Sequence, residues 1–404
     1  MSSISFLSSQ TRRAFFRQAS RLHSSPVKSM SLPVRELPSL FPVSTCSYKL
    51  EHTSALLRYS HTWTQTVQDA ECLIKHPGGS YINPDTLIGE DVSELGSSMS
   101  DWLDLEHPLL RTMSKYYLEE GYNHIHPLIV LMMSRAVNGS ELKDKLQNGI
   151  LPEQRSLSEI TEMIHTASLI HDDVLDYSMS ESTPETAKAA KGNKLSVLGG
   201  DFLLTRASMG LARLRVPEVV ELIALAIENQ VKGEFMKATE AVTEKSLNFE
   251  RCLDQIYLKH ASLMANSCKA AAILGRCESK VINSAYLYGK ELGIAIKLHQ
   301  DVQEWKTAIE EKKSDFKPSI FSGPLILAME THEALKISIK HGSFESNSDV
   351  FEMYDIIRQT KAIERTSEIV ESCCQKAIDI ARSFPTSDAQ QILIKLPQSM
   401  SGKD

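Results

Sequence analysis

The sequence predicts an all-α fold. From about residue 62 onward apolar residues recur at helical spacing, as in EVVELIALAIENQVKGEFM and ASLMANSCKAAAILG. The strict alternation of apolar and polar residues that marks a half-buried strand is absent over any useful length. Clusters of Gly, Pro, Ser and charged residues interrupt the helical pattern, and no internal repeat is evident. These observations favour one helical bundle built on long buried helices.

The first 35 residues differ in composition from the rest of the chain. Six basic residues precede the first acidic residue, Glu36, and serines are frequent. The stretch FFRQASRLHSS, drawn as a helix, is basic and amphipathic, which is typical of a mitochondrial transit peptide. The alternative is a disordered tail that targets nothing, which fits a cytoplasmic protein. We therefore divide the chain into a transit-like or disordered segment, residues 1–60, and an all-α domain, residues 61–404.

Composition excludes several classes of protein. The chain of 404 residues is 42% hydrophobic and 24% charged, which is globular. A formal charge of -7 without a dense basic block argues against nucleic-acid binding. No apolar run approaches the roughly 20 residues of a transmembrane segment. The seven cysteines lack the spacing of zinc ligands, so we expect free thiols in a reducing compartment.

Four interruptions predict where helices end. They lie at KHPGGSYINPD, AVNGSELKDKLQNGILPEQ, SMSESTPETAKAAKGN and KKSDFKPSIFSGP. After the second interruption, PEQRSLSEI predicts a helix start with Ser156 or Ser158 as its cap. The following helix carries an apolar stripe through Ile160, Met163, Ile164 and Ala167.

That helix continues into LIHDDVLD, which places three acidic residues together. Asp172 and Asp176 are four residues apart, so their carboxylates project from one helix face, and Asp173 flanks them. Three acids beside an apolar stripe are costly to bury without a cation. Mg²⁺ fits, because it takes carboxylate oxygens together with phosphate oxygens of a substrate. The alternative is a solvated helix end with acids there by chance.

The segments around these aspartates carry a family resemblance. GNKLSVLGGDFLL, QVKGEFM, YLKHASLMANSCKAAAILG, YGKELGIAIKLHQDVQEW and SIFSGPLILA follow in order. In this order and spacing the chain resembles the trans-isoprenyl diphosphate synthases, the polyprenyl synthetase family, over about residues 80–395. The resemblance implies an isoprenoid synthase type I helical bundle with a central apolar cavity, and it favours a homodimer. It also implies that the three aspartates hold Mg²⁺ on an allylic prenyl diphosphate, which Lys259 and Gln230 contact.

Chain-elongating members of this family bind a second diphosphate, on isopentenyl diphosphate, through a Gly-Lys-x-x-Arg run and two paired arginines. Here GYNHIHP places Asn123 and His126 at the lysine and arginine positions. Glu181 and Ser182 stand at the positions of the paired arginines. At about 1.5–3 kcal/mol per charged hydrogen bond, the loss of four cations would abolish useful binding. Asn123 and His126 remain candidate substrate-contacting residues, and a near-neutral imidazole is the favoured state of His126.

The second aspartate motif is altered as well. Where the family has Asp-Asp-x-x-Asp, this chain has QDVQE, which keeps Asp301 and Glu304 as candidate metal ligands. Lys297 stands where glutamine is usual, and its spacing puts it on the same helix face as both acids. Lys297 is predicted to grip the diphosphate where a magnesium ion is no longer held. The alternative is a solvated or salt-bridged lysine.

A site that ionises an allylic diphosphate without a second diphosphate pocket predicts terpene cyclisation. Metal ions and the two lysines, Lys259 and Lys297, would be catalytic because they stabilise the leaving diphosphate. Aromatic faces could stabilise the carbocation, and the candidates are Phe202, Phe235, Tyr257 and Trp305. The alternative for each ring is simple core packing. The combination resembles atypical fungal terpene cyclases, notably the humulene synthases of tropolone sesquiterpenoid pathways. It implies a Mg²⁺-dependent lyase that converts farnesyl diphosphate to a sesquiterpene such as humulene.

Two other functions stay open. One is a non-catalytic partner subunit of a heteromeric polyprenyl diphosphate synthase for the ubiquinone side chain, which mitochondrial targeting would suit. The complete Asp172, Asp173 and Asp176 triad argues against it, because a chain without chemistry has no need of a metal site. The other is an active chain-elongating synthase, which conflicts with Asn123 and His126. The first alternative would make the chain part of a heteromer.

Overall fold

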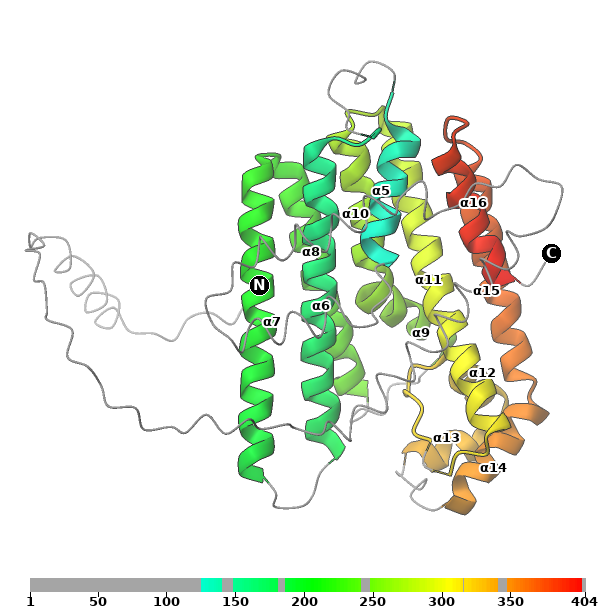
Figure 1. Cartoon of the computed structure of the whole chain (residues 1–404). Coiled ribbons are helices and arrows are strands. Elements are labelled where there is room, and N and C mark those ends of the chain that lie inside the picture. Colours follow the sequence, from blue (N-terminus) through cyan, green and yellow to red (C-terminus); the bar gives the residue numbers. More distant parts are fainter. Residues whose placement is uncertain are drawn as a thin grey trace, which may run out of the picture. The chain divides into compact units, whose positions relative to one another are not determined.

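The regular elements of the described residues are all helices, which confirms the expected fold class (Figure 1). The computed structural model describes residues 125–139, 148–180, 186–240, 248–314, 316–340 and 347–401. Within these helices the side chains of 173–180, 186–193, 195, 238–240, 334, 338–340 and 347–348 are not described. The transit-like segment, the proposed boundary at residue 60, Asn123, Glu181 and Ser182 lie outside these ranges.

The described helices run from residue 125 to residue 401. In chain order they are α5 Ile125–Val137, α6 Pro152–Ser180, α7 Thr186–Leu214, α8 Pro217–Glu240, α9 Phe249–Ile256, η2 Tyr257–Ala261, α10 Ser262–Leu274, α11 Ser279–Glu310, α12 Gly323–Thr331, α13 Glu333–Lys340, α14 Asn347–Gln359, α15 Ala362–Ala381 and α16 Asp388–Ser401. The η2 segment is a single π-helical turn between two α-helices. Three of the predicted interruptions fall between helices, although α7 begins at Thr186, inside the third.

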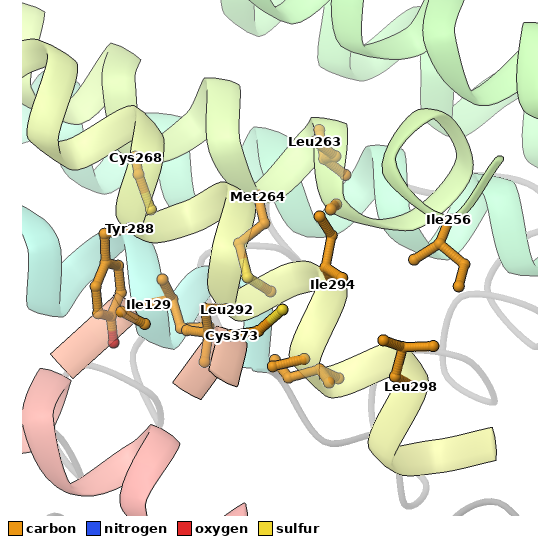
Figure 2. Packing of buried hydrophobic residues seen from close by; sticks show 14 of the residues in the cluster. Ile129, Ile256, Leu263, Met264, Cys268, Tyr288, Leu292, Ile294, Leu298 and Cys373 are labelled. Carbon is orange, nitrogen blue, oxygen red and sulfur yellow. The ribbon is translucent and has the colours of Figure 1, made fainter. Parts of the chain in front are cut away.

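The core lies where α10, α11 and α15 pack side by side (Figure 1). Figure 2 shows Met264 of α10 beside Leu292 and Ile294 of α11, with Cys373 of α15 close by. All four side chains are buried, and burial of apolar surface contributes about 25 cal/mol per Å². The aspartate helix α6 packs along α7, and α8 packs against α10 and η2. The long helices therefore hold the site residues on rigid elements.

Helix α6 begins earlier than its sequence predicts. Pro152 occupies its first position, where the fixed φ of proline suits a helix start. The side-chain Oε1 of Gln154 accepts a hydrogen bond from the backbone N–H of Leu151 at 3.0 Å, which caps the first turn. The expectation that Ser156 or Ser158 caps this helix is wrong, because Ser158 is buried and donates to the Arg155 carbonyl at 2.7 Å within the helix.

Two glycines let α8 and α11 approach the π-helical turn closely. A Cβ added to Gly233 of α8 would lie 2.9 Å from the backbone nitrogen of Lys259. A Cβ added to Gly293 of α11 would lie 2.8 Å from the Cα of Ala261. Real Cβ atoms do not approach backbone so closely, so both positions require glycine for this packing. The π-helical turn is thus held between two helices.

Two expectations from composition can be checked in the described ranges. No helix there is both long enough and apolar enough to cross a membrane. The five described cysteines are free thiols, as expected: Cys252, Cys268, Cys277, Cys373 and Cys374. Burial raises the pKa of the Cys374 thiol to about 12 and that of Cys373 to about 11, with smaller contributions from neighbouring groups. Such thiols stay protonated and unreactive at neutral pH.

Candidate active site

Lys259 joins the aspartate helix to α8. Its ammonium lies 3.2 Å from Oδ2 of Asp172 on α6, and it also donates a hydrogen bond to Oε2 of Glu234 on α8. The lysine side chain is only 10% exposed. A buried ammonium needs compensating charge, and in the free chain these two carboxylates supply it. The structure therefore brings together two residues, Asp172 and Lys259, that sequence reasoning assigned to the same diphosphate.

The backbone around Lys259 explains its position. Lys259 lies in the π-helical turn Tyr257–Ala261, and such turns often occur at functional sites because the extra residue re-aims a side chain. The close approach at Gly233 places the next residue, Glu234, beside the lysine. Sequence reasoning missed Glu234, although it stands within QVKGEFM. The need of a buried lysine for an acidic partner could have pointed to it.

The second motif is held by an internal ion pair. The Lys297 ammonium lies 2.8 Å from Oδ1 of Asp301, one turn along α11. The backbone N–H of Gly323, the first residue of α12, donates to Oδ2 of Asp301 at 2.9 Å. Asp301 is only 1% exposed. Both oxygens of this carboxylate therefore have hydrogen-bond donors supplied by the chain itself, while Glu304 is half-buried farther along the same helix.

His126 is buried at the position where a chain-elongating family member has an arginine. Its ring packs on His165 of α6, with ring centroids 3.9 Å apart and an interplanar angle of 32°. Its Nδ1 is buried without a hydrogen-bond partner among the described residues. Burial, and to a smaller extent His165, hold the pKa of His126 well below its ordinary value. The position therefore carries a neutral imidazole at physiological pH.

His260 shows where the two lysines act together. Burial lowers the pKa of His260 well below its ordinary value, and the charges of Lys297 and Lys259 lower it further. Each of these ammonium groups is paired with carboxylates in the free chain, Lys259 with Asp172 and Glu234, and Lys297 with Asp301.

The other candidate metal-binding and substrate-binding residues lie on α6 and α8. The backbone at Asp173 and Asp176 is helical, so Asp176 stays one turn from Asp172, but neither side chain is described. Gln230 is half-buried on α8, one turn before Glu234. Among the described side chains, no three His, Cys, Asp or Glu residues converge as a metal site. The carboxylate of Asp172 suits Mg²⁺ by its chemistry, so a magnesium ion on this helix stays an expectation.

Two aromatic candidates do not face a shared site. Trp305 is fully buried, donates from Nε1 to Ser322 Oγ at 2.7 Å, and packs edge-on against Phe316 at a centroid distance of 5.0 Å. Phe235 is 69% exposed. The expectation that these two rings stabilise a carbocation is therefore wrong, because one is locked in the core and the other lies at the surface. Helical periodicity does not distinguish such roles.

Comparison with known proteins places the chain among prenyl diphosphate synthases. The sequence profile of the family described as Polyprenyl synthetase matches residues 107–357. A Neurospora crassa protein named probable hexaprenyl pyrophosphate synthase, mitochondrial, is 34% identical over 363 residues, covering 78% of this chain and 80% of that protein. Decaprenyl-diphosphate synthase subunit 1 of Schizosaccharomyces pombe is 32% identical over 339 residues, with 78% and 89% covered.

Solved structures agree on the fold. A decaprenyl diphosphate synthase from Rhodobacter capsulatus superposes with a TM-score of 0.64 at 23% identity, covering 79% of this chain and 97% of that one. The apo form of an Arabidopsis medium/long-chain length prenyl pyrophosphate synthase gives a TM-score of 0.59 at 29% identity, with 79% and 99% covered. Both support the isoprenoid synthase helical fold that the sequence motifs imply.

These relatives contradict the expectation of a terpene cyclase. Their names describe synthases of long prenyl diphosphates, which are prenyltransferases and not lyases. The assignments to a lyase, to a sesquiterpene product and to the humulene synthases are therefore wrong. The inference failed at one step: the missing cations predict a chain that binds isopentenyl diphosphate poorly, but no residue of the chain specified cyclisation as the replacement.

Proposed function

Because the chain belongs to the polyprenyl synthetase family, we propose that it is a subunit of a heteromeric polyprenyl diphosphate synthase, with prenyl chain elongation taking place on a partner chain. The buried, neutral His126 carries this proposal. It stands at the position where the family binds isopentenyl diphosphate with an arginine. A neutral ring packed on His165 offers that diphosphate neither a full charge nor a bidentate contact.

The other substitutions in the isopentenyl diphosphate pocket also argue against elongation by this chain. Asn123, Glu181 and Ser182 replace three further cations of that pocket. A diphosphate carries two to three negative charges, and charge-assisted contacts dominate its recognition. A chain without these contacts has no means of holding isopentenyl diphosphate, so it depends on a second chain for elongation.

The aspartate side of the site retains the groups that hold an allylic diphosphate. Lys259 is buried and fixed between α6 and α8, so its ammonium is aimed before a ligand arrives. An incoming diphosphate would take over the hydrogen bonds that Lys259 makes to Asp172 and Glu234 in the free chain. When bound, Mg²⁺ would join the carboxylates of the Asp172 helix to the diphosphate oxygens and offset their charges. We therefore infer that the chain binds an allylic prenyl diphosphate without elongating it.

The relatives support both the assembly and its location. The Schizosaccharomyces pombe relative is named as subunit 1 of its synthase, and the Neurospora crassa relative is named as mitochondrial. The basic, serine-rich first 35 residues are consistent with import into mitochondria. We propose that the complex works there, on the prenyl side chain of a quinone such as ubiquinone.

Activity assays on the chain with and without a partner test the proposal. The partner is a family member from the same organism that keeps the lysine and arginines of the isopentenyl diphosphate pocket. With farnesyl diphosphate, isopentenyl diphosphate and Mg²⁺, the lone chain should form no longer prenyl diphosphate by mass spectrometry. The co-expressed and co-purified pair should form long prenyl diphosphates faster than the partner alone.

Asp172→Asn separates a supporting role from a catalytic one. In the complex, Asp172→Asn in this chain should leave elongation unchanged within error, whereas substitution of the equivalent aspartate in the partner should abolish it. Circular dichroism and co-purification check that both variant complexes form. Elongation by the lone chain, a hydrocarbon product from farnesyl diphosphate, or loss of elongation on Asp172→Asn would each contradict the proposal.

A further inference from the structure

We infer that Lys297 takes the place of a divalent cation at the second motif, so that the Asp301 side of the site binds no metal ion. The family resemblance leads one to expect Mg²⁺ here, and the residues present do not fit it. This inference goes beyond the proposed function, since it concerns only α11, α12 and the side chains between them. It accounts for how a site that lacks one carboxylate keeps its charges balanced.

Both carboxylate oxygens of Asp301 already have a donor supplied by the chain. Its Oδ1 accepts from the Lys297 ammonium at 2.8 Å, and its Oδ2 accepts from the Gly323 N–H at 2.9 Å. Mg²⁺ requires oxygen ligands at about 2.0–2.1 Å in near-octahedral geometry. A metal ion on this carboxylate would lie close to the Lys297 ammonium, 2.8 Å from Oδ1, and the two positive charges would repel each other.

The amide of Gly323 is held in place by its surroundings. A Cβ at Gly323 would lie 2.8 Å from Cδ2 of Leu298 and 3.0 Å from Cγ2 of Thr366, so the start of α12 is wedged between α11 and α15. The preceding residue, Ser322, accepts the hydrogen bond from Nε1 of Trp305 at 2.7 Å. Asp301 and Trp305 thus fasten the same point of α12 to successive turns of α11.

Burial makes the ion pair persistent. Asp301 is 1% exposed and the Lys297 side chain is 17% exposed, so water screens their attraction poorly. Removing one partner of such a pair leaves an uncompensated buried charge. For a metal ion to replace the Lys297 ammonium at Asp301, the ammonium would have to move out into solvent. The mostly buried side chain of Lys297 opposes that movement.

The charges nearby also disfavour a metal. Lys297 and Lys259 both lower the pKa of His260, so two ammonium groups already act on this region. A divalent cation at Asp301 would be repelled by the Lys297 ammonium. Among the described residues of the motif, Asp301 and Glu304 are the acids on the Lys297 face, and no three acidic, histidine or cysteine side chains converge there.

Counting bound Mn²⁺ on the lone chain tests the inference. Free Mn²⁺ is measured by electron paramagnetic resonance, with and without inorganic diphosphate, for wild type, Lys297→Gln and Lys280→Gln. Lys280 is an exposed lysine near the start of the same helix, so its variant is a matched control for the loss of one charge. Lys297→Gln should bind one more Mn²⁺ per chain than wild type, and Lys280→Gln should match wild type. Equal counts for Lys297→Gln and wild type would overturn the inference.

Thermal melting provides a second measurement in case Lys297→Gln folds poorly. In EDTA, Lys297→Gln and Asp301→Asn should each lower Tm by roughly 5–10 °C, because each leaves one group of a buried pair alone. The double variant should lower Tm by less than the sum of the two single decreases. Mn²⁺ should raise the Tm of Lys297→Gln more than that of wild type. Additive losses would overturn the inference. Neither measurement involves a partner chain, so its failure would leave the proposed function untouched.

Discussion

Three buried or half-buried histidines make the folded chain sensitive to acid. Burial, with a smaller contribution from Lys306, lowers the pKa of His299 on α11 to about 4. Burial also holds the pKa values of His126 and His260 well below the ordinary value. Each of these side chains is stable in the folded chain only as a neutral imidazole. Acid therefore opposes folding at residues that lie among the site helices.

The sign of the pH dependence follows from these shifts. Between the ordinary histidine pKa of about 6.5 and about 4, the unfolded chain binds more protons at His299 than the folded chain does. The free energy of unfolding is therefore highest above pH 6.5 and falls as the pH is lowered, by up to about 3 kcal/mol at pH 4 from His299. Urea unfolding of wild type and His299→Gln at pH 7.5, 6 and 5 checks this. Identical pH slopes for the two proteins would show that His299 does not contribute.

At the scale of elements, the contact between α8 and the π-helical turn positions Lys259. A Cβ at Gly233 would meet the backbone of Lys259 at 2.9 Å, and backbone cannot move aside as a flexible side chain can. Gly233→Ala should therefore push α8 away from the turn and cost about 1–3 kcal/mol of stability. Chemical denaturation measures this loss.

A glycine at an open position serves as the control. A Cβ at Gly139, just after α5, would meet nothing within 4 Å, so Gly139→Ala should change stability by less than about 0.5 kcal/mol. If Gly233→Ala is as stable as Gly139→Ala, the close approach does not constrain the turn. Diphosphate binding by a folded Gly233→Ala variant would then also be expected to match wild type.

The spacing of apolar residues along the sequence predicted the helices well, but it predicted few of the contacts that their side chains make. Period 3.6 in apolar residues is a property of one helix, so the all-α fold and the ends of α5 and α11 could be expected. The shared face of Lys297 and Asp301 follows from their spacing on one helix, and their 2.8 Å contact agrees with it. The pairing of Lys259 with Glu234 joins η2 to α8, and the hydrogen bond from the Gly323 N–H to Asp301 joins α12 to α11. No local pattern specifies such contacts between helices.

Neither the π-helical turn nor the function could be predicted from the sequence, and the reasons differ. A π-turn depends on packing against neighbouring helices, here at Gly233 and Gly293, and it leaves no periodic signature in five residues. The function was inferred from absent residues. Absence of cations at 123, 126, 181 and 182 argues against elongation by this chain alone, and only the relatives indicated which reaction the family performs.

At the scale of the whole molecule, ligands should stabilise the chain selectively. Farnesyl diphosphate with Mg²⁺ should raise Tm, because binding to the folded state alone adds about 2.7 kcal/mol at a ligand concentration of one hundred times Kd. Isopentenyl diphosphate at the same concentration should leave Tm unchanged, since the pocket that would hold it has lost its cations. Differential scanning fluorimetry of the lone chain measures both shifts. Equal stabilisation by the two ligands would show that isopentenyl diphosphate still binds.

The C-terminal helix is tied to the helix that carries Lys297. The hydroxyl of Tyr288, fully buried on α11, donates to the backbone carbonyl of Leu393 on α16 at 2.8 Å. Truncation before α16 would remove that acceptor and part of the cover of Tyr288, nine residues from Lys297 on the same helix. Removal of the last helix, by proteolytic trimming or in a splice variant, would therefore act on the second motif from about ninety residues away in the sequence.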